Sequence, residues 1–365
     1  MKILYDHLCF NEKYGGVSKY FIKMINSLPT EVKYELVIRF SSNEYVAKIK
    51  QNGVIRLFGG KNFRGKASLL NFINKPYSIR SLKSGDYDIY HKTHYDTYGH
   101  KYANDKKIIV TIHDMNCFKI PHYYNSKYVN NIKKLQKVST LRADKIIAVS
   151  DNTKNDLCEY LGISENKITT IYHGIDIATN NNTDRSVFNY PYLLFVGARY
   201  SYKNFDNLVR VFKNISAKYT DLFLICTGNS FTLKEQKMIH DFNLHNKIIH
   251  ISASEEMMNN LYSNAELFIY PSYYEGFGMP LLEAMSCACP VACSNTSCFP
   301  EIAHNAAVYF DPHSIDNMTE TVFMVLSDNV LKEKMKKNGI EQVKLFSWKK
   351  CASAHLNVYS EIMEV

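Results

Sequence analysis

The chain has 365 residues, of which 46% are hydrophobic and 22% charged, so it is long enough for two domains with full cores. No apolar run approaches the roughly 18 to 20 residues of a membrane span, and the first six residues meet a charge too early for a secretory signal. We therefore expect a cytoplasmic protein that does not cross a membrane. The nine cysteines lack paired C-x2-C spacing, which favours free buried thiols over a zinc site.

Apolar strand candidates alternate with helical patterns along the whole chain, which predicts the α/β class with parallel sheets. In the first half the predicted strands are 2–5, 34–39, 88–90, 107–112, 145–149 and 168–171. In the second half they are 192–196, 222–226, 247–250, 267–270, 290–292 and 307–309. Two such series predict two Rossmann-like domains, residues 1–175 and 191–346, joined by a polar, asparagine-rich linker at 176–190.

Positive charge is concentrated between residues 45 and 85, where apolar side chains are interleaved with basic ones and no acid occurs. The nine basic residues are Lys48, Lys50, Arg56, Lys61, Arg64, Lys66, Lys75, Arg80 and Lys83. This pattern suits docking on an anionic membrane surface, with a solvated basic face as the equal alternative. We expect no nucleic-acid partner, because no reading motif accompanies the charge.

Several candidate residues follow predicted strands. Gly15 and Gly16 come after the first strand and open a helix, although a lone glycine pair is weak evidence and Ser18 could cap that helix. His113 ends the strand at 107–112. Arg199 and Lys203 follow the strand at 192–196, at the end of a parallel strand where ligands bind and where two cations could neutralise a diphosphate leaving group.

The most informative segment is Glu275–Glu283, Glu-Gly-Phe-Gly-Met-Pro-Leu-Leu-Glu, which joins two carboxylates to a glycine turn and a helix start. A carboxylate can accept two hydroxyl hydrogen bonds, as vicinal sugar diols offer, and free amides at a helix start attract phosphate or sugar oxygens. Without its surroundings the pair would more often be a loop charge and a solvated helix residue.

The surroundings extend the pattern over some thirty positions, from Ala265-Glu266-Leu267-Phe268-Ile269-Tyr270-Pro271-Ser272 to Pro290-Val291. This segment resembles the E-x7-E signature of glycosyltransferase family 4, retaining enzymes of the GT-B fold, whose two Rossmann-like domains face each other across a cleft. Two positions depart from the family pattern: Ala288 stands where glycine is usual, and His173 where asparagine is common.

The resemblance implies a role for each candidate. Glu275 would contact the donor sugar and Glu283 the nucleotide ribose, while His113 would face the donor sugar across the cleft. The remaining donor-binding residues would be Gly15, Gly16, Arg199, Lys203, Gly276, Phe277, Gly278 and Met279. A secondary role for Arg199 is orienting Glu275 by an ion pair. The resemblance also implies that residues 1–175 form the acceptor-binding domain and residues 191–346 the nucleotide-sugar-binding domain. The final helical pattern, 347–365, looks like the family's C-terminal helix that crosses back onto the first domain.

From this we expect a metal-independent, retaining glycosyltransferase without a cofactor. It would move a hexose, at best guess mannose from GDP-mannose, to a hydroxyl of a glycan or lipid-linked acceptor in cell-surface polysaccharide synthesis. UDP-linked hexoses and dTDP-rhamnose remain open as donors. The alternatives are a non-catalytic sugar- or lipid-binding module and another GT-B enzyme such as an epimerase. Asp86-Tyr87-Asp88 has the shape of a D-x-D metal motif, but we interpret it as a loop.

Overall fold

The computed structural model describes residues 1–46, 49, 53–58, 61, 63, 65–103, 105–177 and 187–364. It divides into two compact units, Met1–Gly174 with Trp348–Val365 and Ile175–Ser347. Most of the expected linker at 176–190 lies outside the described residues, as do Lys48, Lys50 and Arg64 of the basic stretch. Among the helices that the structure describes, none combines the length and apolar character of a transmembrane segment.

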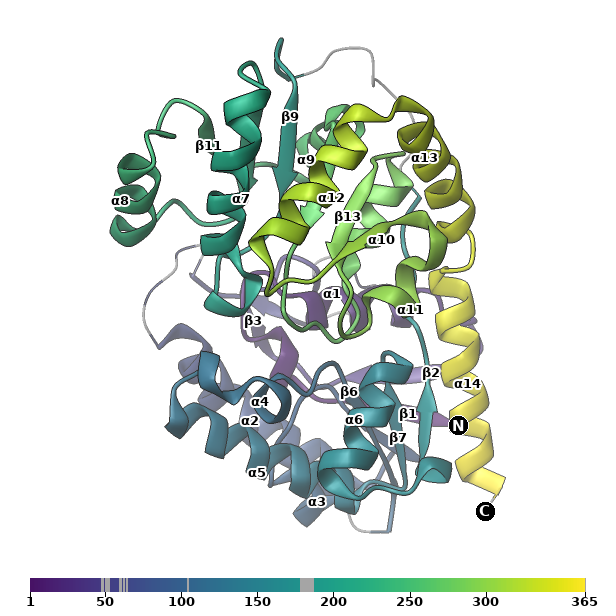
Figure 1. Ribbon diagram of the computed structural model, residues 1–365. Helices are drawn as coiled ribbons and strands as arrows, with labels where there is room; N and C mark the ends of the chain where they lie inside the picture. Colours follow the sequence, from purple (N-terminus) through teal and green to yellow (C-terminus); the bar gives the residue numbers. More distant parts are fainter. Residues whose placement is uncertain are drawn as a thin grey trace. The chain divides into compact units, whose positions relative to one another are not determined.

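Unit 1 is an α/β unit around a six-stranded sheet in the order β2-β1-β5-β6-β7-β8, with every pairing parallel (Figure 1). Its strands are β1 (Lys2–Tyr5), β2 (Lys33–Leu36), β5 (Ile89–Lys92), β6 (Lys107–Ile112), β7 (Lys145–Ala148) and β8 (Ile168–Thr170), with a separate parallel pair β3 (Phe40–Ser41) and β4 (Ile55–Arg56). Its helices are α1 (Gly16–Asn26), α2 (Lys66–Ser84), α3 (Gly99–Tyr102), α4 (Asn116–Lys119), α5 (Ser126–Arg142), α6 (Asp151–Leu161) and α14 (Trp348–Glu364), with the 3-10 turns η1 (Leu8–Phe10), η4 (Pro121–Tyr123) and η5 (Glu165–Lys167).

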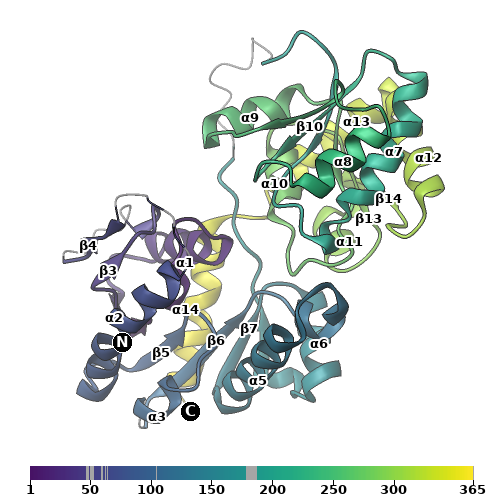
Figure 2. The same cartoon turned by 90° about the vertical axis from the view of Figure 1, so that its left-hand side faces the viewer.

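The last helix, α14, belongs to unit 1 although it follows unit 2 in the sequence. It lies beside α1 (Figure 2), and its buried residues share one hydrophobic core with β1 and α1. Inside that core, the hydroxyls of Tyr359 in α14 and Tyr5 in β1 share a hydrogen bond of 2.9 Å. The expectation that the C-terminal helix returns to the first domain is confirmed.

Unit 2 has a second six-stranded parallel sheet, in the order β11-β10-β9-β12-β13-β14. Its strands are β9 (Tyr192–Phe195), β10 (Phe223–Thr227), β11 (Ile248–Ile251), β12 (Leu267–Tyr270), β13 (Val291–Ser294) and β14 (Val308–Phe310). Its helices are α7 (Phe205–Lys218), α8 (Leu233–Asp241), α9 (Glu255–Asn264), α10 (Met279–Ser286), α11 (Phe299–Ala303), α12 (Ile315–Ser327) and α13 (Asn329–Val343), with the 3-10 turns η6 (Ser201–Lys203) and η7 (His304–Ala306). Helix α7 packs against α12, and α9 and α13 pack against α10.

Both sheets reverse their strand order at one point. In unit 2 the chain first winds from β9 outward to β11 and then from β12 outward to β14, so the reversal lies between β9 and β12. In unit 1 it lies between β1 and β5. In open α/β sheets, ligands bind outside the carboxyl ends of the strands at such a switch point. The fold therefore marks one candidate binding position in each unit.

Candidate functional site

The switch point of unit 2 brings together two of the candidates. Lys203 ends η6, which follows β9, and Glu275 lies in the loop after β12. Lys203 Nζ forms an ion pair with Glu275 Oε1 and donates to the Tyr270 hydroxyl at 3.3 Å. Both charged side chains are about seven-eighths buried, at 13% exposure each. A carboxylate and an ammonium group therefore lie side by side at the strand ends where the fold places a ligand.

Ser297, which sequence reasoning missed, fixes the backbone of Glu275. Its hydroxyl accepts from the Glu275 amide at 3.1 Å and donates to the Glu275 carbonyl oxygen. Ser297 lies beyond the end of β13, the neighbour of β12. Tyr270, the last residue of β12, was missed as well; burial raises the pKa of its hydroxyl well above the usual value. Tyr270 ends β12 and Ser297 follows the adjacent strand β13. This placement at the carboxyl ends of neighbouring strands is the sequence signal that could have identified both residues.

The segment between the two glutamates forms the predicted turn and helix start. Gly278 has φ +80°, a backbone conformation that favours glycine, and a Cβ there would make a tight contact of 3.2 Å with the Phe299 ring. Helix α10 begins at Met279, and Glu283 lies one turn inside it, where its Oε2 accepts from the Tyr262 hydroxyl at 3.4 Å. Gly276 and Phe277 are buried, and the Phe277 ring meets Phe346 edge to face.

Arg199 has different surroundings from Lys203. Its Nε donates to Glu235 Oε1 at 2.9 Å, its Nη1 donates to the Thr227 carbonyl at 3.2 Å, and its Nη2 donates to the Asn229 carbonyl. The guanidinium is stacked near the ring of Phe231, at 4.7 Å from its centroid, and the side chain is 3% exposed. The ion pair with Glu275 that the sequence allowed for Arg199 is formed by Lys203 instead.

His113, in unit 1, directly follows β6. Its ring packs edge to face on Tyr20 at 5.0 Å between centroids, and burial lowers its pKa to about 3. Its Nε2 is covered and finds no hydrogen-bond partner among the described residues. His113 is therefore a neutral side chain with one unused hydrogen-bonding nitrogen. That it faces a donor sugar held by the other unit stays a prediction.

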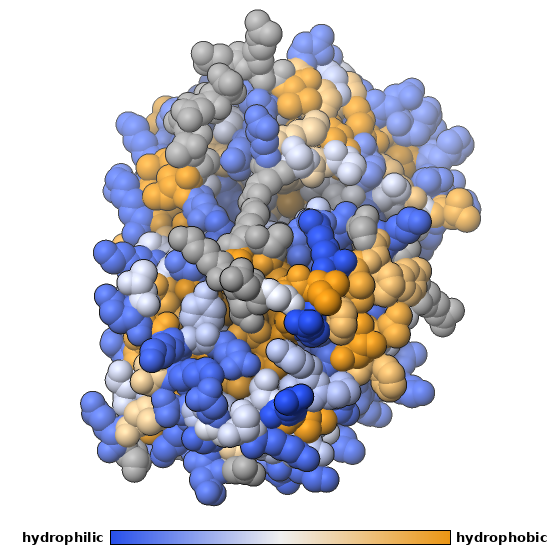
Figure 3. All heavy atoms as spheres, turned by 180° about the vertical axis from the view of Figure 1, so that it is seen from behind, coloured by the Kyte–Doolittle hydropathy of each residue, from blue (hydrophilic) through white to orange (hydrophobic). Residues whose placement is uncertain are grey.

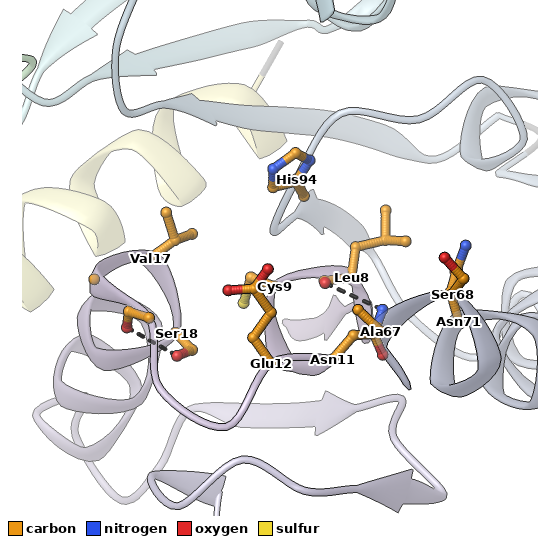
Figure 4. Close-up of a pocket in the computed structure, with 12 residues that line it drawn as sticks. Leu8, Cys9, Asn11, Glu12, Val17, Ser18, Ala67, Ser68, Asn71 and His94 are labelled. Carbon is orange, nitrogen blue, oxygen red and sulfur yellow. Dashed lines mark hydrogen bonds between the residues drawn. The ribbon is translucent and has the colours of Figure 1, made fainter. Parts of the chain in front are cut away.

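Gly15 and Gly16 border a pocket of about 420 Å³ at the switch point of unit 1 (Figure 4). Gly15 is the N-cap of α1, and a Cβ at Gly16 would meet nothing within 4 Å. Ser18 makes no capping bond: its hydroxyl donates to the Gly15 carbonyl at 2.9 Å and accepts from Asn43 Nδ2 at 3.0 Å. The pocket walls also include Glu12 and His94.

All nine cysteines are free thiols, seven of them buried. In the described part of the chain, no three His, Cys, Asp or Glu side chains are placed to hold a metal ion. The D-x-D acids are engaged at the start of unit 1: Asp86 accepts from Lys2 Nζ and Asp88 from the Lys2 amide, each at 2.7 Å. A requirement for metal, or its absence, stays a prediction.

Comparisons with known proteins cover nearly the whole chain. The family model described as "Glycosyltransferase Family 4" matches residues 14–179, and "Glycosyl transferases group 1" matches residues 179–342. O-antigen chain mannosyltransferase B of Escherichia coli is 27% identical over 270 residues, 70% of each chain. O-antigen chain mannosyltransferase RfbU of Salmonella typhimurium is 29% identical over 208 residues, 56% of each chain.

A solved structure extends the similarity to the fold. Sucrose-phosphate synthase from Thermosynechococcus elongatus superposes with a TM-score of 0.75 over 100% of this chain and 99% of its own, at 18% identity. The two parallel α/β units and the shared architecture confirm the expected GT-B fold. With two family models that together span residues 14–342, the chain belongs to the family 4 glycosyltransferases and is a glycosyltransferase.

Proposed function

We propose that this enzyme transfers mannose from GDP-mannose, with retention, to a hydroxyl of a glycan or lipid-linked oligosaccharide during cell-surface polysaccharide synthesis. The observation that carries the proposal is the Lys203–Glu275 pair at the β9/β12 switch point, beside the α10 start. The printed names of the O-antigen mannosyltransferases to which the chain is similar support mannose as the transferred sugar.

The Lys203–Glu275 pair offers a cation for the donor's diphosphate and a carboxylate for its sugar hydroxyls. When a donor binds, its diphosphate competes for the Lys203 ammonium, and the Glu275 carboxylate is released to accept hydrogen bonds from sugar hydroxyls. The bond from the anomeric carbon to the phosphate oxygen breaks, and the acceptor oxygen bonds to the same face of that carbon. The acceptor's proton passes to the leaving phosphate. The protein then supplies positioning and charge stabilisation, with Lys203 nearest the developing charge.

The proposal includes docking on an anionic membrane, because helix α2 has an unusual arrangement of polar and apolar side chains. Its buried stripe has the spacing i, i+4, i+8, i+12, i+16 and is largely polar, comprising Lys66, Leu70, Asn74, Ser78 and Leu82. Phe72, in contrast, is 75% exposed and Leu69 41% exposed. Figure 3 shows hydrophobic side chains exposed among hydrophilic ones on the face opposite to that of Figure 1. Exposed apolar groups among basic ones fit a lipid surface.

The donor is identified by calorimetric titration of the purified protein with GDP, UDP and dTDP. We expect GDP to bind most tightly, and GDP-mannose to be hydrolysed slowly to GDP without acceptor. Tighter binding of UDP or dTDP would replace GDP-mannose by the corresponding sugar donor. If no donor releases a nucleoside diphosphate, the protein is better described as a non-catalytic sugar- or lipid-binding module. Free interconversion of donor sugars would instead indicate an epimerase.

The role of Glu275 is tested by Glu275→Ala. Charge-assisted hydrogen bonds contribute roughly 1.5–3 kcal/mol, so transfer should fall on the order of 10- to 150-fold with folding intact. Glu320→Ala, at an exposed position of α12 in the same unit, is the matched control and should keep full activity. Turnover of Glu275→Ala equal to that of Glu320→Ala would remove Glu275 from the site.

A further inference from the structure

Tyr273, two residues before Glu275, contacts both neighbours of Lys203. Its backbone amide donates to the carbonyl of Tyr202 at 2.9 Å, and its hydroxyl donates to Asn204 Oδ1 at 2.7 Å. The residue before Lys203 and the residue after it are therefore both bound to one residue of the loop that carries Glu275. A single tyrosine thus joins the two loops that supply the cation and the carboxylate of the donor site.

Asn204 has a backbone conformation that needs this support. Its φ is +57°, in the left-handed region that asparagine adopts more readily than most residues. It is the N-cap of α7, yet its side chain forms no capping bond and is 3% exposed. Nδ2 instead donates to the Pro312 carbonyl at 2.8 Å, after β14, while Oδ1 accepts from Tyr273. Asn207, in the first turn of α7, donates to the same tyrosine hydroxyl at 3.2 Å. The backbone turn directly after Lys203 is therefore fixed by side-chain bonds to distant loops.

The loop that carries Tyr273 and Glu275 is itself held from the segment after β13. Thr296 Oγ1 donates to the Tyr273 carbonyl at 3.1 Å, next to the two bonds between Ser297 and the Glu275 backbone. Ser297 also has a left-handed backbone, at φ +58°. The Tyr273 ring stacks on His313, after β14, at 4.7 Å between ring centroids. Segments that follow four strands of unit 2, β9, β12, β13 and β14, therefore meet at this tyrosine.

The spacing of the charged pair depends on such contacts. Lys203 ends the 3-10 turn η6 and Glu275 lies in a loop, so neither is placed by a long helix or by strand pairing. The ion pair between them holds their spacing only until a donor diphosphate competes for the ammonium group. From then on the spacing depends on the bonds that join the two loops. A misplacement of about 1 Å in an active site can cost about 100-fold in rate.

We propose that Tyr273 is a positioning residue of the donor site, which acts through Tyr202 and Asn204 to hold Lys203 in place against the donor diphosphate. The inference rests on the proposed function, because it takes Lys203 as the cation that binds this diphosphate. The part that concerns the two loops is testable without any ligand.

The ligand-free test is amide hydrogen exchange of the Tyr273→Phe variant. This substitution removes the hydroxyl and keeps the ring that stacks on His313, so the fold should persist. The amides of Lys203 and Asn204, which donate to carbonyls within η6 and just before it, should exchange roughly 3- to 10-fold faster, as expected for one lost hydrogen bond.

Tyr192→Phe is the matched control in the same unit. Its buried hydroxyl donates to the Leu261 carbonyl at 2.8 Å, and Tyr192 begins β9, at the strand end opposite to Lys203. It loses one buried tyrosine hydrogen bond as well, but exchange at Lys203 and Asn204 should match the wild type. Equal exchange at these two amides in both variants would overturn the proposal.

The functional test is a double-mutant cycle on the affinity for a nucleoside diphosphate. The ligand is whichever of GDP, UDP and dTDP binds the wild-type protein most tightly in calorimetry, because all three carry the diphosphate. Tyr273→Phe should raise the Kd roughly 3- to 10-fold, and Tyr192→Phe should leave it unchanged. When Lys203 is already replaced by alanine, Tyr273→Phe should have no further effect, because the residue through which it acts is absent.

The cycle separates a positioning role from a purely structural one. Destabilisation alone does not change the Kd of a protein that stays folded, and it acts equally with or without the cation. An equal rise in Kd from Tyr273→Phe in the wild-type and Lys203→Ala backgrounds would therefore overturn this proposal and leave the proposed glycosyl transfer standing. Unchanged diphosphate binding by Lys203→Ala, or no binding of any of the three nucleotides to the wild-type protein, would overturn the proposed role of Lys203 and this inference with it.

Discussion

At the scale of single residues, the two cations that follow β9 have separate tasks. Lys203 neighbours a carboxylate at the switch point, whereas the Arg199 guanidinium is enclosed by Glu235, two carbonyl groups and the Phe231 ring. Gly228 belongs to the same junction, because a Cβ there would lie 2.4 Å from the Gly197 carbonyl oxygen. Arg199 thus holds the loop after β10 against the loop after β9.

Removing Arg199 should therefore destabilise unit 2. Arg199→Ala leaves the Glu235 carboxylate buried without its partner, and breaking a buried ion pair costs about 3–5 kcal/mol. Arg199→Lys should recover little of this, since an ammonium group cannot serve three separated acceptors in the same plane. Urea unfolding, together with hydrogen exchange of the amides in α8, measures the change.

The matched control is Lys234→Ala, which breaks the exposed pair between Lys234 and Asp206 in the same unit, at 3.0 Å. A surface pair contributes only about 0–1 kcal/mol, so the unfolding midpoint should barely move. Equal stabilities of Arg199→Ala and Lys234→Ala would contradict a structural role for Arg199. They would favour the role that the sequence predicted for its guanidinium, which is to bind the donor diphosphate.

Ala288, which departs from the family pattern, ends α10 in the left-handed region at φ +54°. The Cys289 amide donates to the Ala284 carbonyl and the Ala288 amide to that of Met285, both at 3.0 Å, which is the Schellman motif. Glycine is preferred there, so Ala288→Gly should raise the free energy of unfolding by about 0.5–1 kcal/mol. Calorimetric melting measures the gain.

Ala217→Gly, at an exposed position inside α7 of the same unit, isolates the conformational effect. There the backbone is right-handed, and glycine should lower stability by up to about 1 kcal/mol. The two identical substitutions are thus expected to have opposite signs. A loss of stability in both variants would show that the Ala288 methyl group contributes more through packing than it loses through strain.

At the scale of elements, hydrogen bonds of neutral histidines hold α14 against the rest of unit 1. His355 Nδ1 donates to the Cys351 carbonyl at 2.8 Å, so its Nε2 accepts from the Tyr20 hydroxyl, also at 2.8 Å. The Tyr359 hydroxyl meets His91 Nδ1 at 2.7 Å. Burial lowers the pKa of His355 to about 4 and that of His91 well below its usual value. These bonds require rings that carry one proton each.

Lowering the pH should therefore reduce the folding stability of unit 1. Between about pH 6.5 and pH 4 the unfolded chain binds protons that the folded His355 does not, so stability falls as the pH falls, by up to about 1.4 kcal/mol per pH unit for each such histidine. Urea titrations followed by Trp348 fluorescence at pH 7, 6 and 5 measure the slope. His355→Gln, whose amide oxygen can still accept from Tyr20, should make the slope shallower.

His245→Gln, at an exposed position in unit 2, is the control and should leave the slope unchanged. If His355→Gln and His245→Gln follow the wild-type pH dependence alike, then His355 has the same pKa in the folded and the unfolded chain and does not cause the loss of stability in acid.

Sequence reasoning located the elements better than the contacts. Twelve predicted strands correspond to the twelve strands of the two main sheets, because buried parallel strands are short apolar runs between turn residues. The two-residue strands β3 and β4 were missed, since so short a pair carries no periodic pattern. The partners of Arg199 and Glu275 could not be predicted either. Glu235 comes from the first turn of α8 and Ser297 from the segment after β13, and no local pattern specifies which distant side chains meet at two strand ends.

At the scale of the whole molecule, a formal net charge of +9 and the exposed apolar side chains of α2 predict salt-sensitive membrane binding. Phe72 is 75% exposed on a helix that also carries Lys75 and Arg80. Insertion of such a ring into lipid contributes about 1.5–3 kcal/mol when burial is complete. Phe72→Ser should therefore weaken binding to phosphatidylglycerol-containing vesicles roughly 10-fold or more, as measured by co-sedimentation.

The charge contribution is separated by salt. Raising the ionic strength from about 0.1 to 1 M shortens the screening length from about 10 to 3 Å, so the wild-type protein should leave anionic vesicles and bind neutral ones weakly throughout. Leu233→Ser, at an 84% exposed position of α8 in unit 2, removes an equally exposed apolar group and should bind like the wild type. Equal losses in Phe72→Ser and Leu233→Ser would mean that general surface apolarity, rather than the face of α2, governs the association. Binding that does not depend on salt would show that the basic stretch takes no part in the association with vesicles.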